Sequence, residues 1–546
     1  MTNVKFLKSD FEKHIKLTPE IIEKISLFGT PLESINDKEI EIEVFPNRPD
    51  LISLQGFVRS FKAFIGKEKG LKEYSIAKPL ENYKVDISPN LKNIRPFTAC
   101  AIVKNLDFDD KKIKEIIELQ EKLHITIGRN RKKVAIGIYP LDKIKLPIKY
   151  LALEPSKIKF TPLESDGELT ANQILSKHPT GKEFAHLLEG FDKFPIFTDS
   201  LGNILSMPPI INSHTTGKIS QNTKEVFIEC SGSNLETLQK TLNIIVTTLA
   251  EMGGKIFQMH LDYGGKKIIT PDLTPQKIKI SLENVNKLLG LDLKEKDLDR
   301  LLPLMGYEYN NNTVIIPSWR TDIMHEVDII EDIAIAYGYN NLSPEIPNIS
   351  TIGEESKIEK IKLKISDLLI GLEINEISTY HLIKKAEAEL SDLKEKIEVE
   401  NSKTDFKILR SDLLTPALRT FSENKDHDYP QKIFEIGTIF LNDKNNISET
   451  GIIEKDNLLI ALSPSNFTEI KQILNYLELS LNISIEIKEI DHKDLINGRS
   501  ASLLFNKKQI GYFGEVHPKT LQDWNIKMPL SVLEISLNEI MDNINI

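Results

Sequence analysis

The chain has 546 residues, which at roughly 150 residues per domain predicts about three or four domains. Its 70 Lys and Arg against 80 Asp and Glu give a net charge of −10, which excludes a polybasic nucleic-acid binder but leaves a local RNA-binding patch open. Two cysteines are too few for a disulfide framework or a four-cysteine zinc site. We expect a cytoplasmic protein without membrane contact, because the first residues lack a signal-like apolar region and no apolar run approaches about 18 residues.

Several catalytic motifs are absent. No glycine-lysine pair is followed by Ser or Thr, which excludes the phosphate-binding P-loop. No two glycines stand one residue apart, which excludes the glycine loops of dinucleotide-binding proteins and kinases. A nucleotide-driven reaction carried out by this chain alone is therefore not expected.

Residues 1–85 are predicted to form an N-terminal α+β domain. Thr18 is an N-cap before a proline, and Gly29 ends that helix. Residues 39–45 alternate charged and apolar side chains, the period of a half-buried strand. Asp50 is expected to cap a following helix with one apolar stripe. That stripe consists of Leu51, Leu54, Val58, Phe61 and Ile65.

Residues 86–265 are predicted to form a mixed α/β domain. Its expected strands are residues 97–104 and 133–138, and its expected helices are 110–124 and 235–252. Residues 266–277 carry two prolines and are interpreted as a linker.

Residues 278–345 are predicted to form a compact module of three helices and a short strand, which is winged-helix-like by analogy. Gly290 and Gly306 end the first two helices. A second linker, residues 346–357, precedes a final α+β domain, residues 356–546. Its expected helix is 356–372 and its expected strands are 431–441, 457–462 and 501–513. The fold class is therefore multidomain α+β.

The third helix of the module carries a cluster of carboxylates. At about 100° per residue, Asp328, Glu331 and Asp332 share one face with Ile335, and Asp322 precedes the helix. The opposite face, made of Val327, Ile330, Ile333, Ala334 and Tyr337, is the expected core side. Oxygen ligands without His or Cys favour Mg²⁺. The alternative is a solvated acidic face stabilised by the helix dipole.

Three segments together carry a family resemblance. Residues 46–56 (PNRPDLISLQG), 119–138 (LQEKLHITIGRNRKKVAIGI) and 320–339 resemble the β subunit of phenylalanyl-tRNA synthetase, in its short archaeal/eukaryotic form. Further similar segments follow in the same order, so the resemblance covers essentially the whole chain. They are residues 208–213, 227–233, 409–424 and 513–518.

The resemblance implies an α2β2 phenylalanine-tRNA ligase, in which ATP and phenylalanine bind to the α subunit. The β subunit would contribute tRNA(Phe) binding, assembly and hydrolytic editing of Tyr-tRNA(Phe). Residues 356–546 would have the fold of a class II catalytic domain without its active site, in agreement with the missing G-x-G loop. The acidic helix would be a Mg²⁺ site completed by the α subunit. Its implied ligands are Asp322, Asp328, Glu331 and Asp332.

The resemblance also makes residues 86–265 an editing domain. Its pocket is expected near Ser206, Asn212 and Ser213, whose polar groups could recognise the hydroxyl that distinguishes tyrosine from phenylalanine. The substrate's terminal ribose is expected to assist the hydrolysis. From the residues alone, the segment 208–213 could equally be a rigid turn.

Four basic residues stand together in an otherwise acidic chain. Arg129, Arg131, Lys132 and Lys133 could contact tRNA phosphates or form a solvated turn. Arg410 and Arg419 resemble ATP-binding arginines of active class II domains, but without the rest of such a site they are expected to support structure or the α interface.

Two alternatives remain open. A free-standing hydrolase of mischarged tRNA would not need the final domain. A tRNA-binding scaffold with an inactive pocket is favoured by Tyr139-Pro140, which stands where the family leads us to expect a His-Asp pair. The long bacterial-type chains also carry a C-terminal anticodon-binding domain, for which this sequence, ending at Ile546, is expected to leave no room.

Overall fold

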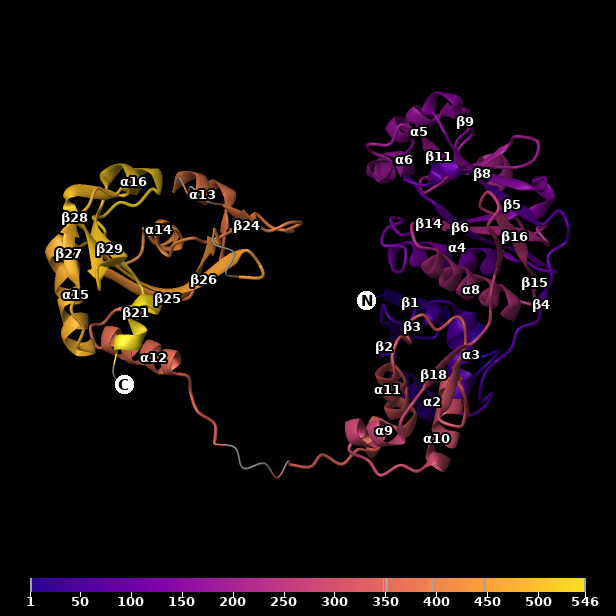
Figure 1. Ribbon diagram of the computed structural model, residues 1–546, viewed down its shortest axis with the longest axis horizontal. Helices are drawn as coiled ribbons and strands as arrows, with labels where there is room; N and C mark the ends of the chain where they lie inside the picture. The colour runs from indigo at the N-terminus through magenta and orange to yellow at the C-terminus, as the bar shows by residue number, and fades with distance from the viewer. Residues whose placement is uncertain are drawn as a thin grey trace. The chain divides into compact units, whose positions relative to one another are not determined.

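The structure is a computed structural model that describes residues 2–346, 348, 352–391, 393, 396–444 and 448–544. The chain forms two compact units, residues 1–346 and 347–546 (Figure 1). Among the described residues, no helix combines the length and the apolar character that a membrane crossing requires.

The first unit begins with a three-stranded antiparallel sheet in the order β1–β3–β2. Ile40, Ile42 and Val44 of β3 are buried as the alternation predicts. The prediction that Asp50 caps the following helix is wrong. The hydroxyl of Ser53 caps that helix, and Asp50 forms an ion pair with Arg48. The elements are β1 (Thr2–Leu7), α1 (Lys8–Phe11), α2 (Pro19–Leu27), β2 (Leu32–Ile35), β3 (Glu39–Val44) and α3 (Leu54–Phe64).

Two sheets then stack on each other. The five-stranded sheet has the order β4–β15–β6–β14–β7, and the seven-stranded sheet has the order β13–β12–β11–β8–β5–β16–β17. Their strands are β4 (Ile76–Ala77), β5 (Lys84–Ile87), β6 (Phe97–Lys104), β7 (Val134–Pro140), β8 (Ile148–Leu153), β11 (Phe194–Thr198), β12 (Ile204–Met207), β13 (Ile211–Asn212), β14 (Val226–Gly232), β15 (Lys255–Phe257), β16 (Met259–Asp262) and β17 (Lys267–Thr270).

Both faces of β6 are buried, which explains its continuous apolar sequence. Ala99, Ala101 and Val103 pack in the core beneath α4 (Asp110–Ile125) and α8 (Leu235–Glu251), whereas Cys100 and Ile102 pack between the sheets. The smaller elements are β9 (Lys159–Phe160), β10 (Leu169–Thr170), α5 (Ala171–Lys177), α6 (Pro179–Phe184) and α7 (His214–Gly217).

The predicted linker 266–277 is wrong. Its first half is β17, an edge strand that pairs antiparallel with β16. Its end is the start of β18 (Gln276–Lys279), a strand of the next module. The two prolines, Pro271 and Pro275, lie between these short strands, so they bound the elements rather than replace them.

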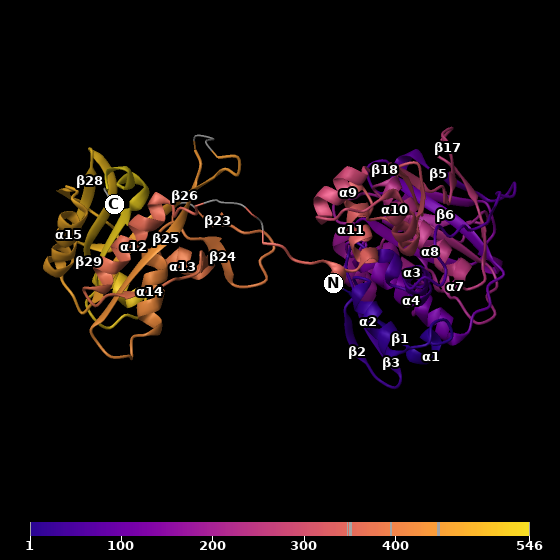
Figure 2. The ribbon, with the colours of Figure 1, turned by 90° about the horizontal axis from the view of Figure 1, so that it is seen from below.

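The next module has a three-stranded sheet, β18–β20–β19, and three helices. Ser281 caps the first helix through its hydroxyl, and Gly290 ends it at φ +66°. This module shares one hydrophobic core with α3 and α8 (Figure 2). The elements are α9 (Leu282–Leu289), α10 (Glu295–Leu301), β19 (Glu308–Asn310), β20 (Thr313–Ile316) and α11 (Glu326–Tyr337).

The second unit is built on a seven-stranded sheet in the order β21–β25–β26–β30–β29–β28–β27. All its pairs are antiparallel except β21 with β25. Its strands are β21 (Asn375–Glu376), β25 (Gln431–Asn442), β26 (Ile452–Ser463), β27 (Glu486–Glu489), β28 (Leu495–Phe505), β29 (Lys508–Val516) and β30 (Ser531–Ser536).

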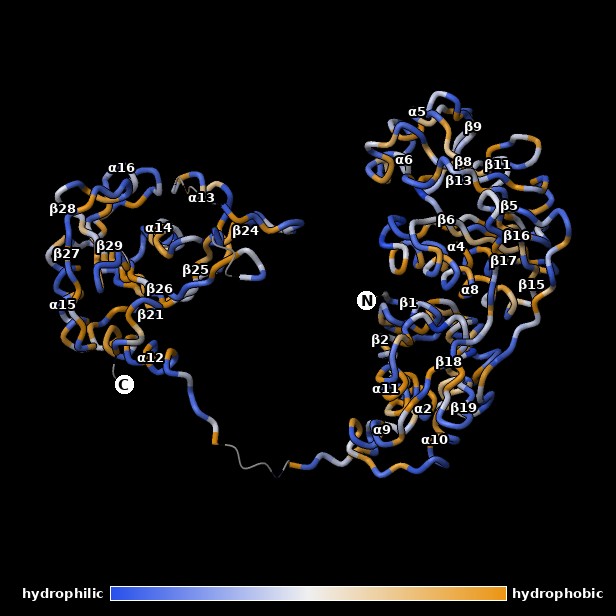
Figure 3. Tube along the Cα trace, in the orientation of Figure 1, coloured by the Kyte–Doolittle hydropathy of each residue, from blue (hydrophilic) through white to orange (hydrophobic). Residues whose placement is uncertain are grey.

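Helices cover both faces of this sheet, and hydrophobic residues concentrate along its central strands (Figure 3). Leu458 and Ile460 of β26 lie in the core beneath α12 (Lys357–Ile370) and α15 (Phe467–Leu481), whereas Leu459 and Ala461 lie in the core beneath α14 (Leu414–Glu423). The remaining elements are β22 (Leu382–Lys384), α13 (Lys385–Leu390), β23 (Ile397–Glu398), β24 (Phe406–Leu409) and α16 (Pro518–Asp523).

Candidate functional site

Asp328, one of the predicted metal ligands, caps the N-terminus of α11. Asp328 Oδ2 accepts hydrogen bonds from the backbone N–H groups of Met324 and His325, at 2.8 Å each. A carboxylate in this position satisfies N–H groups that the helix leaves free and interacts favourably with its dipole. Asp328 therefore has a structural role in the first turn of the helix.

The face of α11 differs from the expectation at two positions. Val327 was assigned to the core, but its side chain is 48% exposed, and Asp332, assigned to the outer face, is buried. The reason is Arg320, which turns the acidic residues inward. Its Nη2 lies 2.7 Å from Asp332 Oδ2, and its Nε and Nη2 donate to the two oxygens of Asp322 at 2.9 and 2.6 Å. Tyr307 donates a further hydrogen bond to Asp332.

Glu331 is the carboxylate of this group that makes neither a hydrogen bond nor an ion pair with the described residues. Partial burial, with the neighbouring charges of Asp332, Asp322 and Asp328, raises its pKa. Burial also favours the neutral form of Asp322, but Arg320 more than offsets this and lowers the pKa of Asp322.

The predicted set of four Mg²⁺ ligands does not fit the structure. Both oxygens of Asp322 are engaged by Arg320. Within the described part of the chain, no group of three or more His, Cys, Asp or Glu side chains is placed to hold a metal ion. All four carboxylates nevertheless border one open cavity of about 1190 Å³.

Two of the four predicted tRNA-binding residues, Arg129 and Lys133, line this same cavity. Lys132 is exposed beside them. Arg131 is different: its side chain is only 14% exposed, pairs with Glu121 at 3.2 Å and donates to the backbone oxygen of Ile210 at 2.8 Å. Arg131 therefore links the loop after α4 to the backbone at Ile210 rather than facing solvent.

The three residues predicted for the editing pocket lie close together. Ser206 on β12 is the register partner of Asn212 on β13, and Ser213 follows directly. Asn212 lines a cavity of about 230 Å³, together with two buried histidines, His124 and His178. Ser206 and Ser213 are buried but do not line this cavity.

Two further residues of this region are not among the predicted pocket residues. Glu229 on β14 also lines the cavity, and burial raises its pKa to about 8. Tyr139 on the adjacent strand β7 donates toward Glu229 Oε1 and Asn212 Oδ1, at 3.2 and 3.3 Å. Among the described residues, the other oxygen of Glu229 and the Ser206 hydroxyl have no hydrogen-bond partner. The available signal was a single glutamate within the apolar run FIEC.

His124 is buried and packed in the fold. The backbone N–H of Ile136 donates to its Nε2 at 2.9 Å, and its Nδ1 lies 3.3 Å from Glu121. These contacts place the protonated nitrogen at Nδ1. Burial lowers the pKa of His124, so it is neutral at pH 7.

The two arginines singled out in the second unit are both engaged by carboxylates. Arg410 Nη1 lies 2.7 Å from Glu435 Oε1, and both side chains are almost fully buried. Arg419 Nη1 lies 3.0 Å from Glu387 Oε2. Both arginines therefore stabilise the fold of this unit.

Comparisons with known proteins cover most of the chain. Residues 278–339 match the family described as tRNA synthetase B5 domain, and residues 342–537 match the phenylalanyl tRNA synthetase beta chain CLM domain. The phenylalanine-tRNA ligase beta subunit of Thermococcus sibiricus is 40% identical over 501 residues, which are 90% of this chain and 89% of the relative. That of Archaeoglobus fulgidus is 35% identical over 533 residues, 96% and 95% of the two chains.

A solved structure supports the first unit. An N-terminal fragment of the phenylalanyl-tRNA synthetase beta subunit from Pyrococcus horikoshii is 40% identical and superposes with a TM-score of 0.59. The match covers 62% of this chain and 99% of the fragment.

Proposed function

The chain belongs to the family of phenylalanine-tRNA ligase beta subunits, and on this premise we propose that it assembles with an α subunit into an α2β2 enzyme that charges tRNA(Phe). The single observation that carries this proposal is identity of 35–40% along about nine-tenths of the chain. ATP and phenylalanine would bind to the α subunit.

The second unit supports a class II-like domain without synthetic activity. Its large sheet is almost entirely antiparallel, and the sequence has no G-x-G loop. Arg410 cannot act as a free ATP-binding group, because Glu435 holds it inside the unit.

Editing of Tyr-tRNA(Phe) would take place in the cavity lined by Asn212 and Glu229. A carboxyl group with a pKa of about 8 is mostly protonated at pH 7, so Glu229 could both donate to and accept from the hydroxyl of a tyrosyl group. Phenylalanine lacks this hydroxyl and would leave buried polar groups unpaired, which is the basis of strong discrimination. The hydrolytic water would be oriented by the terminal ribose of the tRNA.

One observation favours a second candidate, a scaffold without editing. The hydroxyl of Tyr139 already donates toward Asn212 and Glu229, the two groups that would recognise the substrate. A tyrosyl substrate would have to displace these interactions.

Deacylation of Tyr-tRNA(Phe) by the co-expressed α2β2 complex tests the proposal. We expect hydrolysis by the wild type, a loss of about tenfold or more for Glu229→Ala, and faster hydrolysis for Tyr139→Phe. Glu225→Gln, just before the same strand, is the matched control and should hydrolyse at the wild-type rate. If neither the wild type nor Tyr139→Phe hydrolyses Tyr-tRNA(Phe) while Phe-tRNA(Phe) is still made, the scaffold is the better account.

We also propose that Arg129, Lys132 and Lys133 contact tRNA phosphates, because all three are exposed beside the large cavity. Each lost phosphate contact would reduce the slope of log affinity against log salt by about 0.7–0.9. The double variant Lys132→Gln, Lys133→Gln should show this reduction in a filter-binding series, with Lys67→Gln as control. An unchanged slope would remove these residues from the tRNA interface.

For Mg²⁺, we propose a reduced ligand set. Glu331 and the second oxygen of Asp328 make no hydrogen bond to the described residues, whereas Asp322 and Asp332 are held by Arg320. Mg²⁺ bound there, with water and the α subunit completing its shell, would relieve the repulsion that raises the pKa of Glu331.

A further inference from the structure

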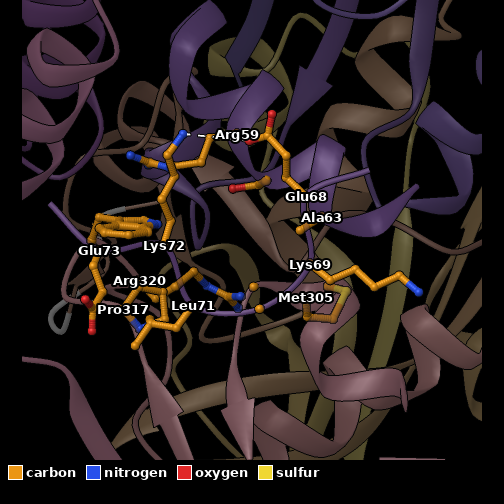
Figure 4. Close-up of a pocket in the computed structure, with 14 residues that line it drawn as sticks. Arg59, Ala63, Glu68, Lys69, Leu71, Lys72, Glu73, Met305, Pro317 and Arg320 are labelled. Carbon is orange, nitrogen blue, oxygen red and sulfur yellow. Dashed lines mark ion pairs between the residues drawn. The ribbon is translucent and has the colours of Figure 1, made fainter. Parts of the chain in front are cut away.

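A further cavity, of about 300 Å³, lies in the first unit (Figure 4). It is bordered by α3, by the segment that follows α3, and by two connections of the three-helix module, one after α10 and one after β20. It shares no lining residue with the proposed editing cavity. None of the carboxylates of α11 lines it, but Arg320, which pairs with Asp332 of that helix, does. Its charged lining residues are Arg59, Glu68, Lys69, Lys72, Glu73 and Arg320.

The guanidinium of Arg59 is buried without a counterion. The side chain is 6% exposed, and its centre lies 4.2 Å above the ring of Trp319. Only Nη1 has a hydrogen-bond partner, the hydroxyl of Tyr74 at 3.1 Å, while Nε and Nη2 are buried with none. Within the described residues, no carboxylate lies within ion-pair distance of Arg59. Unpartnered charged N–H groups in the interior carry a large desolvation cost, which a bound anion would offset.

A second buried arginine has the same deficiency. Arg320 is 4% exposed, and its Nη1 has no partner although Nε and Nη2 bind carboxylates. The two guanidinium groups that line this cavity therefore have three buried N–H-bearing nitrogens, and no described residue accepts a hydrogen bond from them. Arginine presents such groups in the planar arrangement that suits the oxygens of a phosphate.

The two lysines and two glutamates of the cavity balance each other in charge. Lys69 is exposed and has no ion-pair partner among the described residues. Lys72 pairs with Glu251 at 2.8 Å and lies 3.8 Å from Glu68. Glu68 is also held by Lys62 at 2.5 Å, so its charge is matched outside the cavity. Arg59 and Lys69 have no ion pair with the described residues, and neither does Glu73, so these unpaired groups leave one net positive charge for a bound anion.

We propose that this cavity binds a phosphate group through Arg59, Arg320 and Lys69. The volume exceeds that of a bare oxyanion, so the phosphate can be free or part of a larger ester such as a polynucleotide. The three nitrogens without partners would form charge-assisted hydrogen bonds to its oxygens. This inference goes beyond charging and editing and does not depend on either.

Isothermal titration of the full-length chain with inorganic phosphate, in a buffer without other oxyanions, tests the proposal. We expect saturable one-site binding that Lys69→Gln weakens about tenfold and Arg59→Met abolishes. Lys67→Gln, an exposed lysine two residues away that does not line the cavity, should bind as the wild type does. Circular dichroism of each variant checks that the fold is retained, and Lys69→Gln keeps the test valid if Arg59→Met unfolds.

The source of the phosphate is distinguished by competition. If tRNA displaces inorganic phosphate from the wild type, the cavity binds a polynucleotide phosphate; if tRNA and phosphate bind independently, the ligand is a free phosphate compound. The proposal is overturned if phosphate shows no saturable binding up to about 10 mM, a range that covers weak ligands. Equal affinity of wild type, Lys69→Gln and Lys67→Gln would overturn it as well.

Discussion

Glu229 places a carboxyl group inside a sheet, and its energetics therefore depend on pH. Its pKa is about 8 in the folded chain, against 4.5 in a solvated side chain. Between these two values the folded state keeps a proton that the unfolded state has released. The contribution of Glu229 to stability is therefore fully present below pH 4.5 and is lost as pH rises to about 8.

Replacing Glu229 with Gln should remove this dependence, because an amide does not titrate. We expect the melting temperature of the variant to fall less than that of the wild type between pH 5 and pH 8, with little further divergence above the pKa of about 8. Differential scanning calorimetry across this range measures the difference. Parallel curves for the two proteins would contradict the raised pKa, because all other titrating groups are common to both.

The same residue shows where prediction from sequence reached its limit. Ser206, Asn212 and Ser213 form one continuous stretch with β12 and β13, so the sequence could indicate them together. Glu229 and Tyr139 lie on β14 and β7, whereas Asn212 lies on β13 of the other sheet, so the stacking of the two sheets brings them together. Which residues face each other across a sheet depends on strand pairing, and a sequence pattern alone does not set that pairing.

At the scale of elements, α11 shows how one carboxylate can have a structural role that resembles a metal-binding one. Asp328 accepts from two backbone N–H groups at the start of the helix, whereas Glu331 has no such partner. The helix and its glycine-terminated neighbours followed from caps and periodicity, as at Ser281 and Gly290. The inward turn of Asp332 did not, because it depends on Arg320 outside the helix.

Asp328 and Glu331 should therefore respond differently to substitution. We expect Asp328→Ala to lower the free energy of unfolding by about 0.5–2 kcal/mol, the usual cost of a lost N-terminal cap. Glu331→Gln should not destabilise the isolated chain, because it removes a repelled carboxylate. Urea unfolding without Mg²⁺ measures both.

A Mg²⁺ titration of the α2β2 complex separates capping from metal binding. Glu331→Gln should raise the Mg²⁺ concentration needed for tetramer stability if Glu331 is a ligand. Unchanged stability at limiting Mg²⁺ would remove Glu331 from the metal site.

At the scale of the whole molecule, the chain separates into two units with their own hydrophobic cores. The first unit contains the proposed editing cavity, the acidic helix and the arginine-lined cavity, all within residues 1–346. A related N-terminal fragment superposes on 62% of this chain. The sequence indicated the segment 346–357 as the boundary because its composition differs from the flanking periodic segments.

A fragment of residues 1–346 should fold without the second unit. We expect a cooperative melting transition that coincides with one of two transitions in the full-length chain, because each unit buries its own core. Calorimetry of both proteins makes the comparison. A fragment that lacks native-like circular dichroism would contradict independent folding of the first unit.

Arg320 lines the arginine-lined cavity and also pairs with the acidic residues. Its Nε and Nη2 bind carboxylates, whereas its Nη1 has no hydrogen-bond partner among the described residues. An anion bound to Nη1 would weaken the ion pairs of Arg320 with Asp322 and Asp332. A cation on the acidic face would weaken the same ion pairs by competing for the two carboxylates. The two proposed ligands would therefore be thermodynamically linked, and each would change the affinity for the other by the same factor. The side chain of Arg320 would thus couple binding at the two proposed sites.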